Sequence, residues 1–136
     1  MIELVPHVVP AELAAWLQTL DVFVLPSHQE GLCIAALEAM ACGVPVVSTR
    51  CGGPEEFVIP GQTGSLVDFD AASMADGIVA IISDVGQRQK LATGAREITQ
   101  SKYTQLNAES VLTSALKLTF PHLQFDQLKL SSCARS

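Results

Sequence analysis

Two glutamates, Glu30 and Glu38, are the residues whose type and spacing could do chemistry in this sequence. Between Gly31 and Cys42 every residue except Glu38 is apolar or glycine, which is typical of a helix buried on all sides. An ionised carboxylate is costly in such surroundings unless polar groups meet it. A helix would separate the two carboxylates by roughly 12 Å along its axis and by roughly 80° around it. We therefore expect the pair to hold two ends of an elongated ligand.

Each glutamate also has a purely structural explanation. Glu38 could be a buried carboxylate that backbone amides or a neighbouring arginine satisfy, because buried charges are usually paired. Glu30 could be an ordinary surface residue of the loop ahead of the helix. A separation of roughly 12 Å exceeds that of a glycosidase pair. The sequence contains no HExxH, Walker A or GxGxxG motif, so ligand binding is the chemistry that the glutamates favour.

Three apolar runs predict the strands that position these residues. Val22–Leu25 and Pro45–Thr49 flank the glutamate stretch and are continuous rather than alternating, as in parallel strands with helices on both faces. Ser65–Val67 predicts a third strand after a turn at Pro60–Gly64. Strands that alternate with helices indicate a three-layer α/β fold. Ligands of such folds bind at the carboxyl ends of the strands, where Glu30 stands.

Two short glycine-containing segments could contact the same ligand through their backbone. Gly31, Leu32 and Cys33 open the predicted helix, where free N–H groups and the helix dipole suit a phosphate. Gly31 could equally serve only a tight turn. Gly52 and Gly53 end a predicted strand and would let the backbone approach a ligand closely. An isolated glycine pair is, however, more often an ordinary turn.

Apolar periodicity predicts further helices at Pro10–Leu20, residues 71–83, Gln87–Ile98 and Gln105–Leu118. Trp16 falls on the apolar side of the first helix, so we expect it in the core. Asp70 caps the second helix, whose expected apolar face comprises Ala75, Ile78, Val79 and Ile82. Ile2–Val5 could form a short strand. The stretch after Pro121 carries no clear pattern.

Composition limits the class of protein and the kinds of partner. With 49% hydrophobic and 16% charged residues, the 136-residue chain can bury the core of one domain. The formal net charge of −6 argues against nucleic acid as a partner, although a helix N-terminus can still bind an anionic ligand. No apolar run reaches membrane-spanning length and no signal-peptide pattern opens the chain. We therefore expect a cytoplasmic protein.

The four cysteines do not form a metal-binding pattern. Cys33, Cys42 and Cys51 recur every nine residues, which matches no common zinc spacing, and none belongs to a CxxC pair. We expect these three to be buried reduced thiols. Cys133 lies in a polar tail and is expected to be exposed.

The pattern as a whole resembles a known family. Glu30-x7-Glu38, followed by residues 39–47 (AMACGVPVV), resembles the donor-binding half of GT-B fold retaining glycosyltransferases of family 4, the glycosyl transferases group 1. Residues 21–27 (DVFVLPS), the glycine pair at 52–53 and Gly61-x-Thr63-Gly64 are similar to that family in order and spacing. The resemblance runs from about residue 5 to residue 116. Cys33 stands where the family often has glycine.

The resemblance implies a role for each candidate residue. Glu30 would be the catalytic carboxylate that holds the donor sugar, and Glu38 would bind the ribose of the nucleotide. The segments 31–33 and 52–53 would complete the substrate site. The donor would be a nucleotide sugar such as a UDP-, GDP- or ADP-hexose, which is the substrate, and neither a metal nor another cofactor is implied. The hexose would pass to an acceptor hydroxyl with retention of configuration.

The resemblance also implies an incomplete protein. Residues 1–118 would be a partial Rossmann-like nucleotide-sugar-binding domain, the C-terminal half of a GT-B enzyme without its first βαβ unit, and residues 119–136 a tail. The basic residue that usually neutralises the donor diphosphate would be missing. The acceptor half would be missing as well, so we expect the isolated chain to be weak or inactive. One alternative is a non-catalytic assembly fragment that self-associates or pairs with an N-terminal acceptor half through the helix at Gln105–Leu118. A GT-B epimerase fragment is a third hypothesis.

Overall fold

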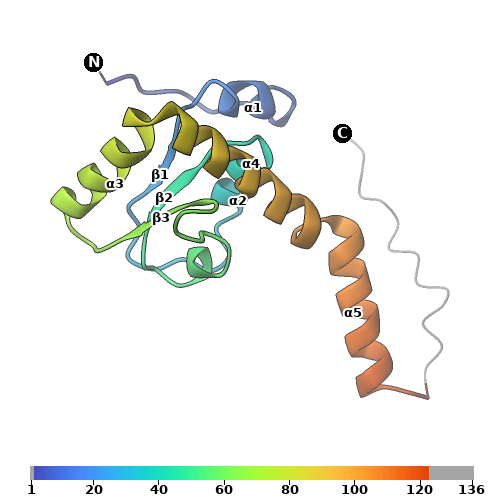
Figure 1. Cartoon of the computed structure of the whole chain (residues 1–136). Coiled ribbons are helices and arrows are strands. Elements are labelled where there is room, and N and C mark those ends of the chain that lie inside the picture. The colour runs from blue at the N-terminus through green and yellow to red at the C-terminus, as the bar shows by residue number, and fades with distance from the viewer. Residues whose placement is uncertain (1, 123–136) are drawn as a thin grey trace. The chain divides into compact units, whose positions relative to one another are not determined.

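The structure is a computed structural model that describes residues 2–122 (Figure 1). Its strands form one parallel sheet in the order β1-β2-β3. The helices and strands, in chain order, are α1 (Pro10–Leu17), β1 (Phe23–Leu25), α2 (Ile34–Ala41), β2 (Val46–Thr49), the 3-10 helix η1 (Gly53–Glu56), β3 (Gly64–Val67), α3 (Ala71–Ser83), α4 (Val85–Lys102) and α5 (Gln105–Thr119). The expected α/β fold with a parallel sheet is confirmed.

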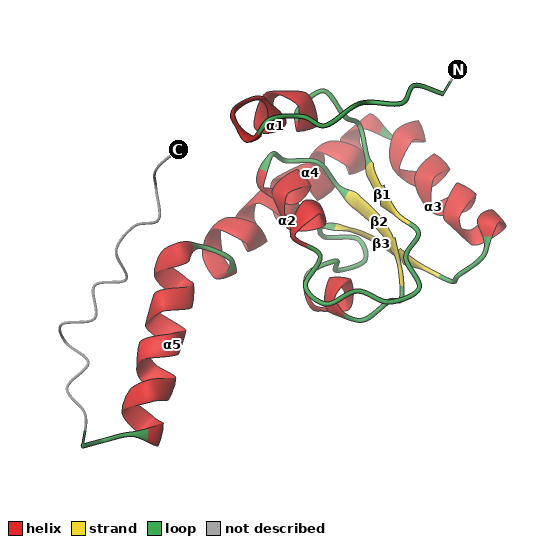
Figure 2. Cartoon of the chain, turned by 180° about the vertical axis from the view of Figure 1, so that it is seen from behind, coloured by secondary structure: helices red, strands yellow, loops and turns green. Residues whose placement is uncertain are grey.

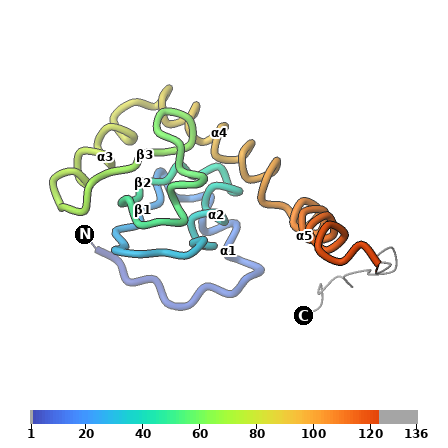
Figure 3. The backbone as a smooth tube through the Cα atoms, turned by 90° about the horizontal axis from the view of Figure 1, so that it is seen from below, coloured from blue at the N-terminus to red at the C-terminus, as the bar shows by residue number. Residues whose placement is uncertain are grey.

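The first of two compact units, residues 1–100, contains the sheet and has three layers (Figure 2). One core cluster, centred on Leu17, Ala39 and Val44, joins α1 and α2 on one face of the sheet. A second cluster, centred on Val47, Ile81 and Leu91, joins α3 and α4 to the other face. Figure 3 shows α1 and α4 on opposite sides of the strands.

The central strand β2 confirms the expectation of a strand covered on both faces. All four of its residues are buried, whereas the residues of β1 are only half-buried. Val47 belongs to the cluster with Ile81 and Leu91, and because side chains alternate along a strand, the buried Val46 faces the other side of the sheet. Trp16 packs against the cluster of α1 and α2, which confirms its expected place in the core. Residues 2–9 contain no strand, so the expectation for Ile2–Val5 is wrong.

Helix α3 has the predicted bounds but a different core-facing side. A Cβ on Gly77 would lie 2.9 Å from Val67 Cγ1 and 3.0 Å from Val47 Cγ1, so the missing side chain lets the helix lie close to the sheet. This contact turns Gly77 and Ile81 inward. Of the four residues expected to face the core, Ile78 is half-buried, while Ala75, Val79 and Ile82 are exposed.

The second unit, residues 101–136, contains α5, which has nearly the predicted bounds. Thr104 caps it by accepting a hydrogen bond from the Asn107 N–H, and none of its residues is buried. The boundary between the units falls within α4, and the division of the chain at residue 118 stays a prediction. Cys133 lies outside the described residues. In the part of the chain that is described, no helix combines the length and apolarity needed to cross a bilayer.

Candidate functional site

Glu30 is held firmly at the carboxyl ends of β1 and β2. The Ser27 hydroxyl donates to Glu30 Oε1 at 2.6 Å, which orients the half-buried carboxylate. The backbone N–H of Glu30 donates to the Cys51 carbonyl at 2.7 Å, and its carbonyl accepts from Gly53 N–H at 3.2 Å. These two backbone hydrogen bonds therefore join the loop after β1 to the loop after β2. This is the edge of a parallel sheet at which ligands bind.

The glycine pair after β2 is explained by the chain's own backbone. Gly52 has a φ of 100°, and a Cβ there would lie 2.9 Å from the Glu30 carbonyl oxygen. A Cβ on Gly53 would lie only 1.3 Å from the carbonyl oxygen of Gly31. Both positions require glycine because the loop that carries Glu30 passes directly against them. A contact between the pair and a ligand stays a prediction.

The three residues expected to open the central helix lie just ahead of it. Cys33 is the N-cap of α2, with a left-handed φ of 55°, and the helix begins at Ile34. Leu32 is 46% exposed. The amides of Ala36 and Leu37 donate to the Cys33 carbonyl, whereas those of Ile34 and Ala35 have no acceptor in the described part of the chain. These two N–H groups are available to an anion.

The expectation that Glu38 is a buried carboxylate is wrong. Helix α2 buries one side, with Ala36, Leu37, Ala39 and Met40, and leaves Glu38 exposed. Ile34, one turn earlier, is 66% exposed, so the helix is not covered all round. Among the described residues no group forms a hydrogen bond or ion pair with the Glu38 carboxylate. Its oxygens are therefore open to the hydroxyl groups of a ligand.

The far end of α2 is also fixed, which sets the direction of the whole helix. Gly43 follows the helix with a φ of 80°, as expected for a residue that ends a helix. Arg96 of α4 donates from Nε to the Ala41 carbonyl at 3.2 Å and from its terminal nitrogen to the Cys42 carbonyl at 3.4 Å. These bonds satisfy carbonyls that a helix end leaves without partners. Glu38 thus stands on a rigid support.

The three cysteines within the described residues are free thiols, and their burial differs from the expectation. Only Cys51 is buried, whereas Cys33 and Cys42 are half-buried, so the expectation that all three are buried is wrong. Burial is the main cause that raises the pKa of the Cys33 thiol, with the nearby Glu30 carboxylate adding to it. Cys33 therefore remains protonated at neutral pH and is a weak nucleophile.

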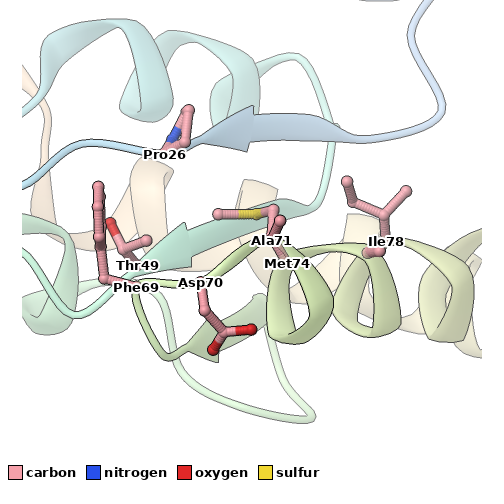
Figure 4. A pocket seen from close by; sticks show the side chains of 8 residues that line it. Pro26, Thr49, Phe69, Asp70, Ala71, Met74 and Ile78 are labelled. Carbon is pink, nitrogen blue, oxygen red and sulfur yellow. The ribbon is translucent and has the colours of Figure 1, made fainter.

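A groove of about 430 Å³ lies beside the site, at the carboxyl ends of the strands. Its lining is mostly apolar and consists of Pro26, Thr49, Phe69, Asp70, Ala71, Met74, Ala75 and Ile78. Figure 4 shows the groove with these side chains as sticks. None of the glutamates or glycines proposed from the sequence lines it. The exposed ring of His28 stacks on Phe69 with 3.6 Å between ring centroids. Sequence patterns could not reveal this contact, because the two residues are far apart in the chain.

The open parallel sheet, with polar groups at the carboxyl ends of its strands, has the architecture of α/β domains that bind ligands at this edge. The model of the family described as glycosyl transferases group 1 matches residues 1–84. The chain belongs to this family. D-inositol 3-phosphate glycosyltransferase from Pseudarthrobacter chlorophenolicus is 45% identical over 91 residues, which are 66% of this chain and 22% of that protein. This chain thus spans only a fraction of that relative's length.

Solved structures show the same fold. Sucrose-phosphate synthase from Thermosynechococcus elongatus matches 88% of this chain and 30% of its own, with a TM-score of 0.80 and 31% identity. The C-terminal domain of a group 1 glycosyl transferase from Francisella tularensis matches 75% of this chain and 53% of its own, with a TM-score of 0.68 and 31% identity. Anabaena HepE in complex with UDP matches 74% of this chain and 29% of its own, with a TM-score of 0.66 and 26% identity.

Proposed function

We propose that this chain supplies the donor-binding part of a retaining glycosyltransferase that moves a hexose from a nucleotide sugar to an acceptor hydroxyl. The observation that carries the proposal is the Glu30 carboxylate at the carboxyl ends of the strands, followed by the exposed Glu38 in the second turn of α2. Glu30 is oriented by Ser27, and Glu38 stands exposed and without a partner in the described chain. Family membership and the UDP complex of the similar HepE structure support it.

Each candidate residue has a physically distinct task in this proposal. Glu30 accepts hydrogen bonds from the donor sugar and positions it for reaction, as the catalytic carboxylate. Glu38 accepts the hydroxyls of the ribose, the task of an acidic residue in dinucleotide-binding folds. The backbone of Gly31, Leu32 and Cys33, together with the open amides at the start of α2, stabilises the departing diphosphate.

The glycine pair Gly52 and Gly53 would border the sugar subsite, since it contacts the loop that carries Glu30. The nucleotide sugar, with UDP, GDP or ADP as its carrier, acts as substrate, and the proposal involves no metal or other cofactor. Retention of configuration belongs to the proposal as well. A cytoplasmic location stays a prediction from the sequence.

Thermal unfolding with UDP-, GDP- and ADP-glucose tests donor binding. We expect one nucleotide class to raise the melting temperature of the wild-type chain, because a ligand that binds only the folded state stabilises it. Glu38→Ala should weaken binding about tenfold or more, since a hydrogen bond to a charged group contributes roughly 1.5–3 kcal/mol. Glu97→Ala, which removes an exposed glutamate of α4, is the matched control and should leave the shift unchanged.

If no nucleotide sugar shifts the melting temperature of a cooperatively folded wild-type chain, this chain does not bind the donor as proposed. An equal shift in melting temperature for wild type and Glu38→Ala would show that the chain binds the donor but that Glu38 does not contribute to binding.

An assembly module remains the second candidate function, because α5 exposes several large apolar side chains. Leu106 is 79% and Leu118 is 86% exposed, and Val111 and Leu112 are exposed as well. Apolar surface of this kind favours association with another chain. Sedimentation equilibrium separates the two functions. A strict monomer that binds nucleotide sugar contradicts self-association, whereas a stable oligomer without donor binding supports it.

A further inference from the structure

An exposed aromatic pair stands at the carboxyl edge of the sheet. The rings of His28, in the loop after β1, and Phe69, in the loop after β3, have centroids 3.6 Å apart and planes inclined by 34°. Phe69 is 51% exposed, and His28 is exposed as well. Single exposed apolar residues are ordinary on a protein surface. A stacked pair that two loops bring together at the ligand-binding edge is different, because its flat apolar surface suits a ring-shaped ligand.

Hydrogen bonds fix the loop on both sides of His28. Before it, the Ser27 carbonyl accepts a hydrogen bond from the Thr49 hydroxyl of β2, and the Ser27 hydroxyl donates to the Glu30 carboxylate at 2.6 Å. After it, the Glu30 N–H donates to the Cys51 carbonyl at 2.7 Å. The backbone that carries the His28 ring is therefore preorganised, which lowers the entropy that a ligand must overcome to bind there.

Two aspartates flank the exposed phenyl ring in the sequence. Asp68 and Asp70 precede and follow Phe69, and both are exposed. The Asp70 carboxylate accepts hydrogen bonds from the Ser73 N–H at 2.9 Å and from the Ser73 hydroxyl at 2.6 Å. A carboxylate has about four lone-pair positions, so Asp70 can accept further hydrogen bonds from a ligand. Carboxylates beside an aromatic surface favour a ligand that combines hydroxyl groups with an apolar ring face, and they repel an anion.

The aromatic pair and Glu38 belong to opposite faces of the sheet. Glu38 stands on α2, which packs with α1 on one face. Phe69 leads directly into α3, which packs on the other face. Glu30 follows His28 by two residues and precedes α2 in the chain. A donor whose sugar is held by Glu30 and whose ribose is held by Glu38 would therefore leave the side of the aromatic pair to a second ligand.

We propose that the His28–Phe69 pair is an acceptor subsite, on which a neutral pyranose ring stacks its apolar face while its hydroxyl groups donate to Asp68 and Asp70. The groove that Phe69 borders has a volume of about 430 Å³ (Figure 4). This volume falls within the roughly 300–1,000 Å³ of small-molecule sites, so the groove can hold the remainder of the acceptor. The inference rests on the proposed function, because it names the acceptor of the hexose as a neutral carbohydrate.

An NMR titration without nucleotide tests the subsite. The probes are methyl α-D-glucopyranoside, methyl α-D-mannopyranoside and methyl α-D-galactopyranoside, and the readout is the chemical shift of each backbone amide. We expect at least one probe to shift the amides of residues 27–29 and 68–70 in a saturable manner. The methyl glycoside of the corresponding uronic acid should bind at least about fivefold more weakly, because its carboxylate meets the two aspartates.

Substitutions of phenylalanine assign the binding to the pair. Phe69→Ala should weaken binding of the glycoside at least about fivefold, whereas Phe69→Trp keeps an aromatic face and should retain it. Both variants should fold, because the Phe69 side chain is 51% exposed. Phe120→Ala is the matched control, since Phe120 is 42% exposed and contacts the ring of His122 edge-on with 6.4 Å between centroids. This control should bind the glycoside as wild type does.

Three results would overturn the proposal. The first is a wild-type chain in which no probe shifts the amides of residues 27–29 or 68–70. The second is equal affinity of the glycoside for wild type and Phe69→Ala. The third is a uronic acid glycoside that binds as tightly as the neutral one, which would contradict the role of the aspartates. Donor binding is measured separately, by melting temperature with nucleotide sugars, so its failure and the failure of this subsite are distinguishable.

Discussion

Replacing Gly53 by alanine should disrupt the loop that carries Glu30. A Cβ at this position would lie 1.3 Å from the Gly31 carbonyl oxygen and 3.0 Å from Leu32 Cα. Non-bonded heavy atoms settle at about 3.5 Å, so the two backbones must move apart by about 2 Å. Overpacking of this kind costs about 1–3 kcal/mol, and the hydrogen bond from Gly53 N–H to the Glu30 carbonyl contributes about 1 kcal/mol.

We therefore expect Gly53→Ala to lower the free energy of unfolding by about 2–4 kcal/mol, a large part of the 5–15 kcal/mol typical of a domain. Urea denaturation followed by circular dichroism measures this change. Gly31→Ala is the matched control, because no atom lies within 4 Å of its added Cβ, and it should change stability by less than about 0.5 kcal/mol. If Gly53→Ala unfolds within about 0.5 kcal/mol of wild type, the close contact between the loops is refuted.

Two further predictions concern the starts of helices α2 and α3. Cys33→Gly should stabilise the chain by about 0.5–1 kcal/mol, since the left-handed φ of 55° is strained for cysteine and free for glycine. Cys33→Ala keeps the Cβ, so an equal gain there would contradict the strain argument. At the start of α3, the Ser73 hydroxyl and N–H donate to the Asp70 carboxylate and lower its pKa below the ordinary 3.8. These hydrogen bonds to the ionised carboxylate therefore stabilise the folded chain fully above its ordinary pKa of 3.8. The stabilisation is lost as the pH falls through the lowered pKa of the folded state. Asp70→Ala should lower the urea midpoint of unfolding at neutral pH. The difference between the midpoints at neutral and acidic pH should become smaller in this variant, and an unchanged difference would contradict the assignment.

The sequence predicted the parts of this protein that depend on near neighbours in the chain. The apolar run at 45–49 is enough to indicate a buried parallel strand, and β2 proved to be buried throughout. Asp70 caps α3 through Ser73, only three residues away, and Gly43 ends α2 with a positive φ. The motif around Glu30 and Glu38 correctly indicated the glycosyl transferases group 1 family.

The environment of the candidate residues could not be predicted from the sequence. The apolar surroundings of Glu38 in the sequence suggested burial, yet burial depends on which sides of α2 meet α1 and the sheet, and the described chain covers only one of them. In α3, Gly77 decided which side faces the sheet, because its lack of a side chain permits the closest approach. Periodicity reveals an apolar side of a helix but not the neighbour that covers it.

The amino-acid sequence alone determined the order of the strands and main helices, the cap of α3 at Asp70 and the family, since these follow from local backbone preferences and a short motif. Only the tertiary structure decided that the Gly53 backbone packs against Gly31, that Glu38 is open to solvent and that β1 pairs with β2 alone within residues 2–122. These properties arise where segments distant in the chain meet, or fail to meet. A pattern among neighbouring residues does not show which distant segments come into contact.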